Sequence, residues 1–380
     1  MIRAKAQRNP RTLDAPGRRL TEGAHPVLLR PRELAHLARP ATERLPLAGG
    51  PMAFAAVDEV VPGQPTPSVR PLPLSALDDD RHRANRHAVT AARAPFAGVA
   101  LDRPRIVGVV NVTPDSFSDG GRYLTPERAI AHGCDMLEAG ADILDVGGES
   151  TRPGAAPVAA ADELRRVVPV IEALHQHGAV ISVDTRNPET MLAAAAAGAA
   201  IVNDVTALSH SPDSARTAAR SGLAVVLMHM RGTPPTMQVR PRYDHAPCEV
   251  YAELSRAVQR ARAAGLPPHR IVVDPGLGFG KNQAHNLTLL TWLPMFHCLG
   301  HGLMVGASRK SIIGRLDRNA PVSDRLGGSL AIALHAASQG ANLVRVHDVA
   351  ETRQALRVWD ALGRSMAEAA PGLDDRPRRA

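Results

Sequence analysis

Short apolar runs alternate with longer Ala- and Leu-rich stretches between about residue 104 and residue 362. The short runs are rich in β-branched side chains and predict strands at residues 106–110, 143–146, 180–183, 200–202, 224–228, 271–273, 303–305 and 343–346. The longer stretches predict helices, among them residues 126–139, 161–175, 188–197, 250–264, 325–339 and 349–362. This alternation predicts an α/β fold on a parallel sheet, either closed into a barrel or open and doubly wound.

Polar or small residues follow nearly every predicted strand. They are Asn111, Gly147-Gly148-Glu149, Asp184, Asn203-Asp204, His229, Asp274, Ser308 and His347. In a barrel all eight strand ends converge on one mouth, which carries the active site. In an open sheet, only strands beside the switch point would share a crevice. The eight polar ends therefore favour a (β/α)8 TIM barrel over residues 101–365, followed by a tail at 366–380.

Residues 1–100 form an N-terminal extension rich in Arg, Pro and Ala, without sustained periodicity. This composition predicts a segment that is partly disordered or packed on the barrel. Residues 29–40 could form a short helix, and Gly49 and Gly50 predict a hairpin. If the extension is an appendage, deletion of residues 1–80 should leave activity largely intact.

The chain carries 45 Lys and Arg against 37 Asp and Glu, and only Lys5, Lys281 and Lys310 are lysines. Residues 1–100 hold 15 basic and 9 acidic side chains, so the main body is almost balanced and predicts no nucleic-acid partner. Its longest uncharged apolar run, residues 191–202, is too short to cross a membrane. The three separated cysteines and the lack of a signal-peptide pattern predict a cytoplasmic protein.

Two polar loops follow the first two strands. NVTPDSFSDGGRY, residues 111–123, is longer than a minimal connection, and its Asn111 and Asp115 offer oxygen ligands for magnesium or for a developing positive charge. GGESTRPGA, residues 147–155, offers Thr151 and Arg152 to an anion. Either loop alone could be only a solvated turn.

Three polar side chains at later strand ends predict recognition of a flat heterocycle such as a pterin. Asp184, Asn203 and Asp274 present carboxylates and an amide, although Asp184 alone could cap the next helix. The following DPGLGFGKN matches neither a dinucleotide-binding nor a Walker pattern, so it does not indicate NAD or ATP. Its glycines could let the backbone wrap a ligand, with Phe279 stacking on an aromatic ring.

The last two strand ends carry cations. Arg309 and Lys310 follow Ser308 in GASRKSIIG, and RVHD at residues 345–348 adds an arginine and a histidine. Groups in this part of a barrel commonly bind phosphate. The other histidines have no recognisable metal spacing, and no G-x-S-x-G elbow is present.

In this order the motifs resemble those of the dihydropteroate synthases of folate biosynthesis. The resemblance covers about residues 104–363 and includes NVTPDSFSDGG, GGESTRPGA, VDT, ND, MHMRGTPPTMQ, DPGLGFGK, SRKS and RVHD. It implies a TIM-barrel transferase that condenses 6-hydroxymethyl-7,8-dihydropterin diphosphate with 4-aminobenzoate, giving 7,8-dihydropteroate and diphosphate. The N-terminal extension is the one departure from the family core.

The resemblance also implies roles for individual residues. Catalysis would use Asp115, Lys310, Arg345 and His347. The pterin would contact Asp184, Asn203, Met228, Asp274, Phe279, Gly306 and Lys310. The diphosphate would contact Asn111, Arg345 and His347, with Asn111 also a ligand of the magnesium cofactor. Phe117, Thr151, Arg152, Pro153 and Ser308 would form the aminobenzoate side.

The implied reaction is a magnesium-assisted departure of diphosphate, stabilisation of the pterin cation by Asp115 and attack by the neutral arylamine. A homodimer and sulfonamide sensitivity are further family expectations. Two alternatives remain at this point: a methyltetrahydrofolate-type corrinoid methyltransferase, and an inactive pterin-binding or scaffold barrel. Neither needs the SRK and RVH cations or the first loop, and diphosphate release from both substrates would separate all three.

Overall fold

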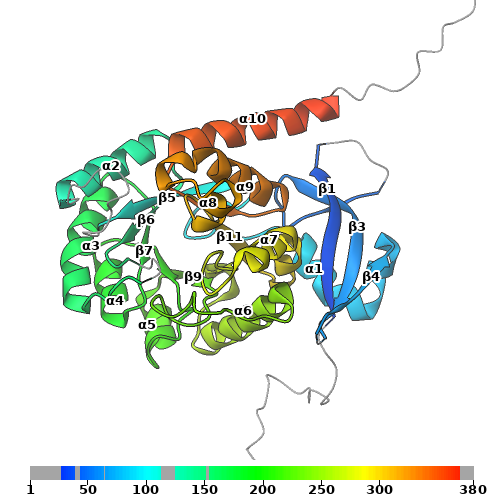
Figure 1. Cartoon of the computed structure of the whole chain (residues 1–380), viewed down its shortest axis with the longest axis horizontal. Helices are drawn as coiled ribbons and strands as arrows, with labels where there is room; N and C mark the ends of the chain where they lie inside the picture. The colour runs from blue at the N-terminus through cyan, green and yellow to red at the C-terminus, as the bar shows by residue number, and fades with distance from the viewer. Residues whose placement is uncertain (1–26, 39–42, 64, 113–124, 151–153, 369–380) are drawn as a thin grey trace, which may run out of the picture.

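The computed structural model describes residues 27–38, 43–63, 65–112, 125–150 and 154–368. Its centre is a closed barrel of eight parallel strands, in the order β10-β11-β12-β5-β6-β7-β8-β9 (Figure 1). These strands are β5 (Arg105–Asn111), β6 (Ile143–Gly147), β7 (Ile181–Asp184), β8 (Ile201–Asp204), β9 (Ala224–Met228), β10 (Ile271–Asp274), β11 (Gly302–Gly306) and β12 (Leu343–Val346). The predicted barrel and all eight of its strands are confirmed.

The alternation of side chains along each strand separates the inside of the barrel from the outside. Every second residue of a strand, such as Ile106 and Leu144, faces outward and joins the core between strands and helices. Residues of the other parity, such as Val107 and Ile143, form a second apolar cluster inside the barrel. Phe96 belongs to this inner cluster and is 1% exposed. The inner cluster fills the end where the strands begin, so polar residues of the same parity gather at the other end.

Helices surround the barrel and connect its strands. They are α2 (Pro126–Glu138), α3 (Ala160–Gln176), α4 (Pro188–Ala196), α5 (Ser214–Ser221), α6 (Ala246–Ala263), α7 (Gln283–Thr291), α8 (Ser311–Leu316), α9 (Leu326–Ser338) and α10 (Val349–Glu368). The helices α5, α7 and α8 are not among the examples given from the sequence. In the described part of the chain, no helix has both the length and the apolar character needed to cross a bilayer.

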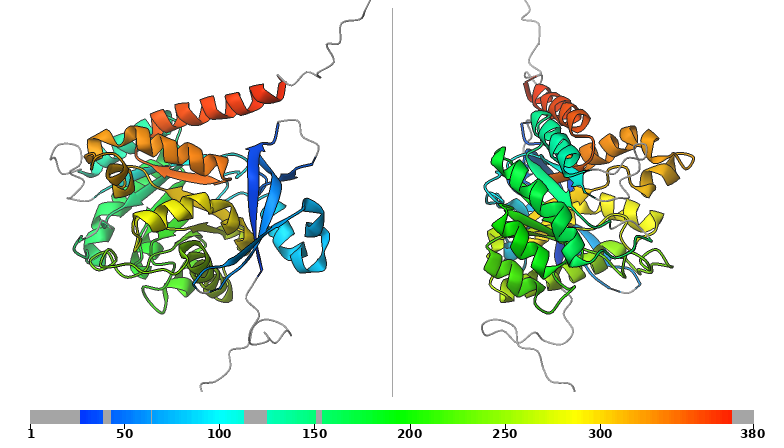
Figure 2. Two further views of the ribbon diagram at one scale, coloured as in Figure 1. Left: turned by 45° about the vertical axis from the view of Figure 1, so that its right-hand side comes forward. Right: turned by 90° about the vertical axis from the view of Figure 1, so that its left-hand side faces the viewer.

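A small antiparallel sheet from the N-terminal extension lies beside the barrel (Figures 1 and 2). It consists of β1 (Leu28–His36), β2 (Leu45–Pro46), β3 (Met52–Val61) and β4 (Ser68–Leu72), followed by α1 (Asp80–Thr90). The predicted helix at residues 29–40 is wrong, because residues 28–36 pair with β3; residues 39 and 40 lie outside the described part of the chain. The predicted hairpin at Gly49 and Gly50 is confirmed, since it joins β2 to β3.

The sheet shares one continuous core with the barrel. Leu29 and Phe54 are fully buried and belong to the same apolar cluster as Phe296 in the 3-10 helix η5 (Leu293–Leu299). The Leu29 amide donates to the Cys298 thiol at 3.3 Å, and that thiol donates back to the Leu29 carbonyl at 3.2 Å. The described residues between 27 and 100 thus form a module that is packed on the barrel.

Candidate active site

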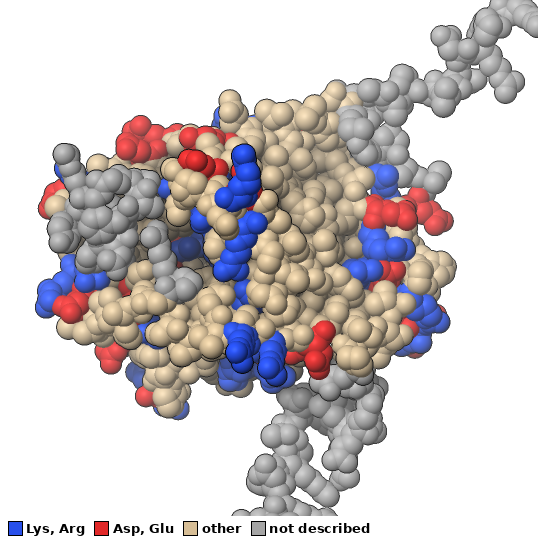
Figure 3. Space-filling view, in the orientation of Figure 1, with Lys and Arg blue, Asp and Glu red and all other residues tan. Residues whose placement is uncertain are grey.

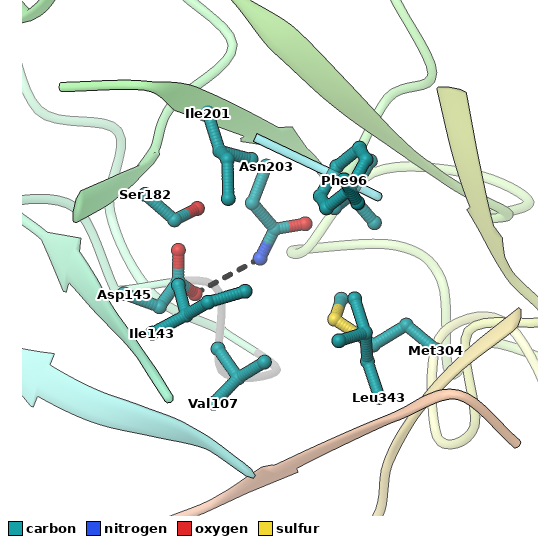
Figure 4. A pocket seen from close by; sticks show the side chains of 10 residues that line it. Phe96, Val107, Ile143, Asp145, Ser182, Ile201, Asn203, Met304 and Leu343 are labelled. Carbon is teal, nitrogen blue, oxygen red and sulfur yellow. Dashed lines mark hydrogen bonds between the residues drawn. The ribbon is translucent and has the colours of Figure 1, made fainter. Parts of the chain in front are cut away.

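The predicted site residues meet at the mouth where the barrel strands end. Asn111, Asp184, Asn203, Met228, Asp274, Gly306 and Arg345 all have the inward parity at the last or next-to-last strand positions. Most of these side chains are buried, and a small cavity continues below them among the inner apolar residues. Figure 4 shows Asp145, Ser182 and Asn203 around this cavity, with Phe96 also lining it.

Arg345 joins two carboxylates inside the barrel. Its Nη2 donates to Asp184 at 2.8 Å, and its Nε donates to Asp145 at 2.6 Å. Burial raises the pKa of Asp184 to about 7; Arg345 opposes this shift and Asp145 adds to it. Two acids sharing one guanidinium in a dry site are each incompletely neutralised, so this cluster favours a ligand that brings hydrogen-bond donors.

Asn203 presents a buried acceptor that lacks a protein donor. Its Nδ2 donates to Asp145 at 3.0 Å, the bond drawn as a dashed line in Figure 4. This bond fixes the orientation of the amide and turns Oδ1 away from Asp145. Among the described residues no group donates to that oxygen. A buried acceptor without a partner is costly, so it marks a place where a ligand N–H would bind.

Asp145 is a site residue that the sequence reasoning missed. It is fully buried in the middle of β6 and contacts both Asn203 and Arg345. The available signal was a lone carboxylate within the otherwise apolar run ILDV. A charged residue at an inward position of a buried strand requires a partner, and here that partner comes from β12.

Asp274, Lys310 and Phe279 form the opposite wall. The Gly276 amide donates to Asp274 Oδ1 at 2.7 Å. Lys310 donates to the Leu277 carbonyl at 2.5 Å, and its Nζ lies 4.5 Å from the centre of the Phe279 ring. Burial lowers the pKa of Lys310 to about 8, although Asp274 opposes this shift. Burial raises the pKa of Asp274, again against Lys310.

Ser308 and His347 lie together at the ends of β11 and β12. The His347 amide donates to Ser308 Oγ at 3.2 Å, and His347 Nδ1 lies 3.0 Å from the same oxygen. The neighbouring Arg309 is bound through two nitrogens to Asp348. Of the two cations expected to attract an anion there, Lys310 faces the site and Arg309 instead joins two loops.

The structure gives a structural role to one further polar strand end. Asp204 is fully buried and accepts hydrogen bonds from the Thr206 amide, the Thr206 hydroxyl and the Leu208 amide. Because these donors all belong to the turn after β8, Asp204 shapes that turn rather than facing a ligand.

Asn111 lies at the end of β5, where its Oδ1 would be 3.9 Å from a Cβ built on Gly147. Among the described residues no group of three His, Cys, Asp or Glu side chains could hold a metal ion. The predicted residues Asp115, Phe117, Thr151, Arg152 and Pro153 lie outside the described part of the chain.

Comparison with known proteins agrees with this geometry. The family model for pterin binding enzymes matches residues 107–347. The dihydropteroate synthase of Escherichia coli K12 is 50% identical over 267 residues, which is 70% of this chain and 94% of that protein. The enzyme of Neisseria meningitidis serogroup B is 45% identical over 283 residues, or 73% of this chain and 98% of that protein.

Solved structures lead to the same family. A Yersinia pestis dihydropteroate synthase in complex with a sulfonamide drug has a TM-score of 0.67 and 46% identity, covering 70% of this chain and 96% of that one. The Xanthomonas albilineans enzyme in complex with 7,8-dihydropteroate has a TM-score of 0.63 and 46% identity, covering 72% and 97%. The matches cover the barrel, which is the part of the chain that carries the candidate site. The chain therefore belongs to the pterin-binding enzymes and, within them, to the dihydropteroate synthases.

Proposed function

We propose that this chain condenses 6-hydroxymethyl-7,8-dihydropterin diphosphate with 4-aminobenzoate to form 7,8-dihydropteroate and diphosphate. The observation that carries the proposal is the buried Oδ1 of Asn203, to which no described group donates, on a strand that lies between those of Asp184 and Asp274 in the barrel order. A flat ring with several N–H donors on its edge satisfies all three acceptors together. Family membership supports the same substrate class.

In this proposal the lower part of the site holds the pterin. Asp184, Asn203 and Asp274 accept hydrogen bonds from the ring and its amino group. Lys310 donates to a ring acceptor, for which its Nζ would use a proton not given to Leu277. Three less polar residues pack around the ring: Met228, Phe279 and Gly306.

The diphosphate would contact Asn111, Arg345 and His347 at the mouth. Arg345 uses Nε and Nη2 for the two carboxylates, so Nη1 is the nitrogen left to face a phosphate oxygen. As the diphosphate leaves with the electron pair of the broken C–O bond, this guanidinium stabilises the negative charge on it. The adjacent carboxylate of Asp184 stabilises the positive charge that develops on the pterin.

Magnesium fits this mouth as an ion held by one protein ligand and by the substrate. Mg²⁺ prefers oxygen ligands, and it is usually bound by one or two side chains plus substrate phosphates. The amide oxygen of Asn111 is of this kind, and no larger ligand cluster exists among the described residues. When bound, the ion would neutralise charge on the diphosphate.

The arylamine would approach from the side formed by Phe117, Thr151, Arg152, Pro153 and Ser308. Its neutral nitrogen attacks the exocyclic methylene carbon, a C–N bond forms and the nitrogen then loses a proton. Asp115 would help to stabilise the cation before this attack. Ser308, held beside His347, is the member of this set within the described residues.

We also propose a cytoplasmic homodimer that sulfonamides inhibit. The helices α7 and α9 contain no Lys, Arg, Asp or Glu, and they meet where His335 Nε2 lies 3.1 Å from the Leu290 carbonyl. Figure 3 shows a broad face without charged side chains in the area of these helices. Such a face suits pairing with a second copy, which light scattering after size exclusion would detect.

The direct test is release of diphosphate by the purified chain. We expect release only when the pterin diphosphate, 4-aminobenzoate and magnesium are all present. Tight pterin binding without release would instead favour an inactive pterin-binding barrel. Methyl transfer to a corrinoid without diphosphate release would favour the methyltransferase alternative.

A further inference from the structure

Lys281 is a buried cation beneath the loop that joins β10 to α7. It is 1% exposed, and no described carboxylate forms an ion pair with it. Its Nζ donates to the Gly276 carbonyl at 2.8 Å and to the Phe279 carbonyl at 2.9 Å. Burial lowers the pKa of Lys281 well below its ordinary value. A lysine in such a place costs stability unless its donors have a specific task.

The third partner of Lys281 is His229, at the end of β9. Lys281 Nζ lies 2.9 Å from His229 Nδ1, and His229 Nε2 lies 2.9 Å from Glu253 on α6. Because the carboxylate only accepts, Nε2 carries the proton and Nδ1 accepts from the ammonium. Burial, together with the charge of Lys281, lowers the pKa of His229 to about 4, which keeps the ring neutral. Glu253 also pairs with Arg231.

Side chains bind each carbonyl of the loop from Gly276 to Phe279. Lys281 donates to the carbonyls of Gly276 and Phe279. Lys310 donates to that of Leu277, and Gln238 Nε2 donates to that of Gly278 at 2.5 Å. The Phe279 amide also donates to the Gly276 carbonyl at 3.2 Å, so one turn hydrogen bond and these side-chain donors together hold the shape of the loop.

The two neighbouring loops lie in direct backbone contact. Gly276 and Gly280 have φ of +66° and +63°, and a Cβ on either would overlap the carbonyl oxygen of His229 or Arg231. Their positions therefore tolerate no side chain. The β10–α7 loop consequently rests on the β9–α6 loop, with Lys281 enclosed at the junction.

Lys281 forms its hydrogen bonds toward the site through backbone groups, and its charge also opposes the rise in the pKa of Asp274. It binds the Gly276 carbonyl, and the Gly276 amide in turn orients the Asp274 carboxylate. It also binds the carbonyl of Phe279, whose ring contacts Lys310. We infer that Lys281, together with His229 and Glu253, is a positioning residue that fixes Asp274 and Phe279 for the pterin. The expected effect of Lys281 on kinetics rests on the proposed function. Its expected effect on the position of Phe279 does not.

The structural test uses Lys281→Met, which keeps the length of the side chain and removes its donors. The chain has five phenylalanines, so labelling with 4-fluorophenylalanine gives at most five fluorine signals, and Phe279→Leu assigns the relevant one. We expect the Phe279 signal to shift or broaden in Lys281→Met, with the Phe54 and Phe296 signals unchanged. An unchanged Phe279 signal would overturn the inference.

Two further variants keep this test decisive. Glu253→Ala removes the partner of His229 Nε2 in the Lys281–His229–Glu253 relay. It is expected to move the Phe279 signal in the same direction as Lys281→Met, and it provides the test if Lys281→Met does not fold. Arg256→Met removes an exposed cation from the same helix and is expected to leave that signal in place. A Phe279 signal that Glu253→Ala leaves unmoved would contradict the relay.

Kinetic measurements test whether the position of the β10–α7 loop affects binding of the pterin substrate. At a temperature well below its melting transition, Lys281→Met is expected to lose about tenfold to a hundredfold in kcat/KM, mostly through a higher KM for the pterin substrate. A purely structural lysine would lower the melting temperature without changing KM. If the wild-type chain forms no dihydropteroate, the proposed function fails, whereas the fluorine signals still decide the role of Lys281.

Discussion

Arg345 Nε donates to the Asp145 carboxylate at 2.6 Å, inside the barrel and below the proposed pterin site. Asp145 also accepts from Asn203, so one carboxylate orients the donor for the diphosphate and the amide for the pterin. Its second oxygen, Oδ1, has no donor among the described residues. Asp145 therefore links the diphosphate side of the site, at Arg345, to the pterin side, at Asn203, and it can do so without touching substrate.

Asp145→Asn is expected to reduce kcat/KM by about tenfold to a hundredfold, because Arg345 loses a charged acceptor and can leave its position. Steady-state kinetics with each substrate varied would measure this. Asp142→Asn is the matched control: it lies just before the same strand at the opposite end of the barrel, where it pairs with Arg105. Equal kinetic losses in both variants would contradict a specific role for Asp145.

Lys310→Ala is expected to impair turnover with little loss of folded structure. Since the pKa of Lys310 is lowered to about 8, the ammonium loses its proton as the pH rises through that value. Wild-type kcat/KM should therefore fall above about pH 8, whereas Lys310→Arg should lack this alkaline limb. If kcat/KM of the wild type and of Lys310→Arg depended on pH in the same way, Lys310 would not be the titrating group of the proposed site.

Deletion of residues 1–80 is expected to destabilise the barrel, because β1 and β3 share a core with it and the extension is more than an appendage. The deletion would remove Leu29 and Phe54 from a shared core and expose η5 to solvent. Phe54→Ala alone should cost about 3–5 kcal/mol of unfolding free energy. Denaturant unfolding would test both changes, and an undiminished stability after deletion would restore the appendage interpretation.

Acid is expected to destabilise the fold through buried histidines. Burial lowers the pKa of His297 to about 3 and that of His301 to about 4. The unfolded chain therefore binds more protons between pH 4 and pH 6.5, so the unfolding free energy rises with pH over that window and is lost on acidification. His297→Leu should flatten this slope, as urea titrations at several pH values would show.

The barrel was predictable because its strands are buried on both faces. Continuous β-branched runs and polar strand ends are local signals, and both appear in the sequence before any contact is known. The same alternation put Asp184, Asn203 and Asp274 at one mouth. Asp145 was missed because the partners that explain it come from β8 and β12, far away along the chain.

The N-terminal module was harder to predict for a related reason. Residues 29–40 have apolar positions that suit a helix as well as a strand, and the pairing of residues 28–36 with β3 decides between them. Lys281 is a second residue whose role depends on distant contacts. The glycine-rich motif that contains it assigns it no partner, whereas the structure puts its ammonium beneath the loop, on the backbone carbonyls.

The most direct test of the proposed synthase activity is the product formed by the purified wild-type chain. Given 6-hydroxymethyl-7,8-dihydropterin diphosphate, 4-aminobenzoate and magnesium, it should form 7,8-dihydropteroate and diphosphate in equal amounts, as measured by mass spectrometry and a coupled diphosphate assay. Diphosphate without dihydropteroate, or neither product from a folded chain that binds the pterin, would contradict the proposed synthase activity.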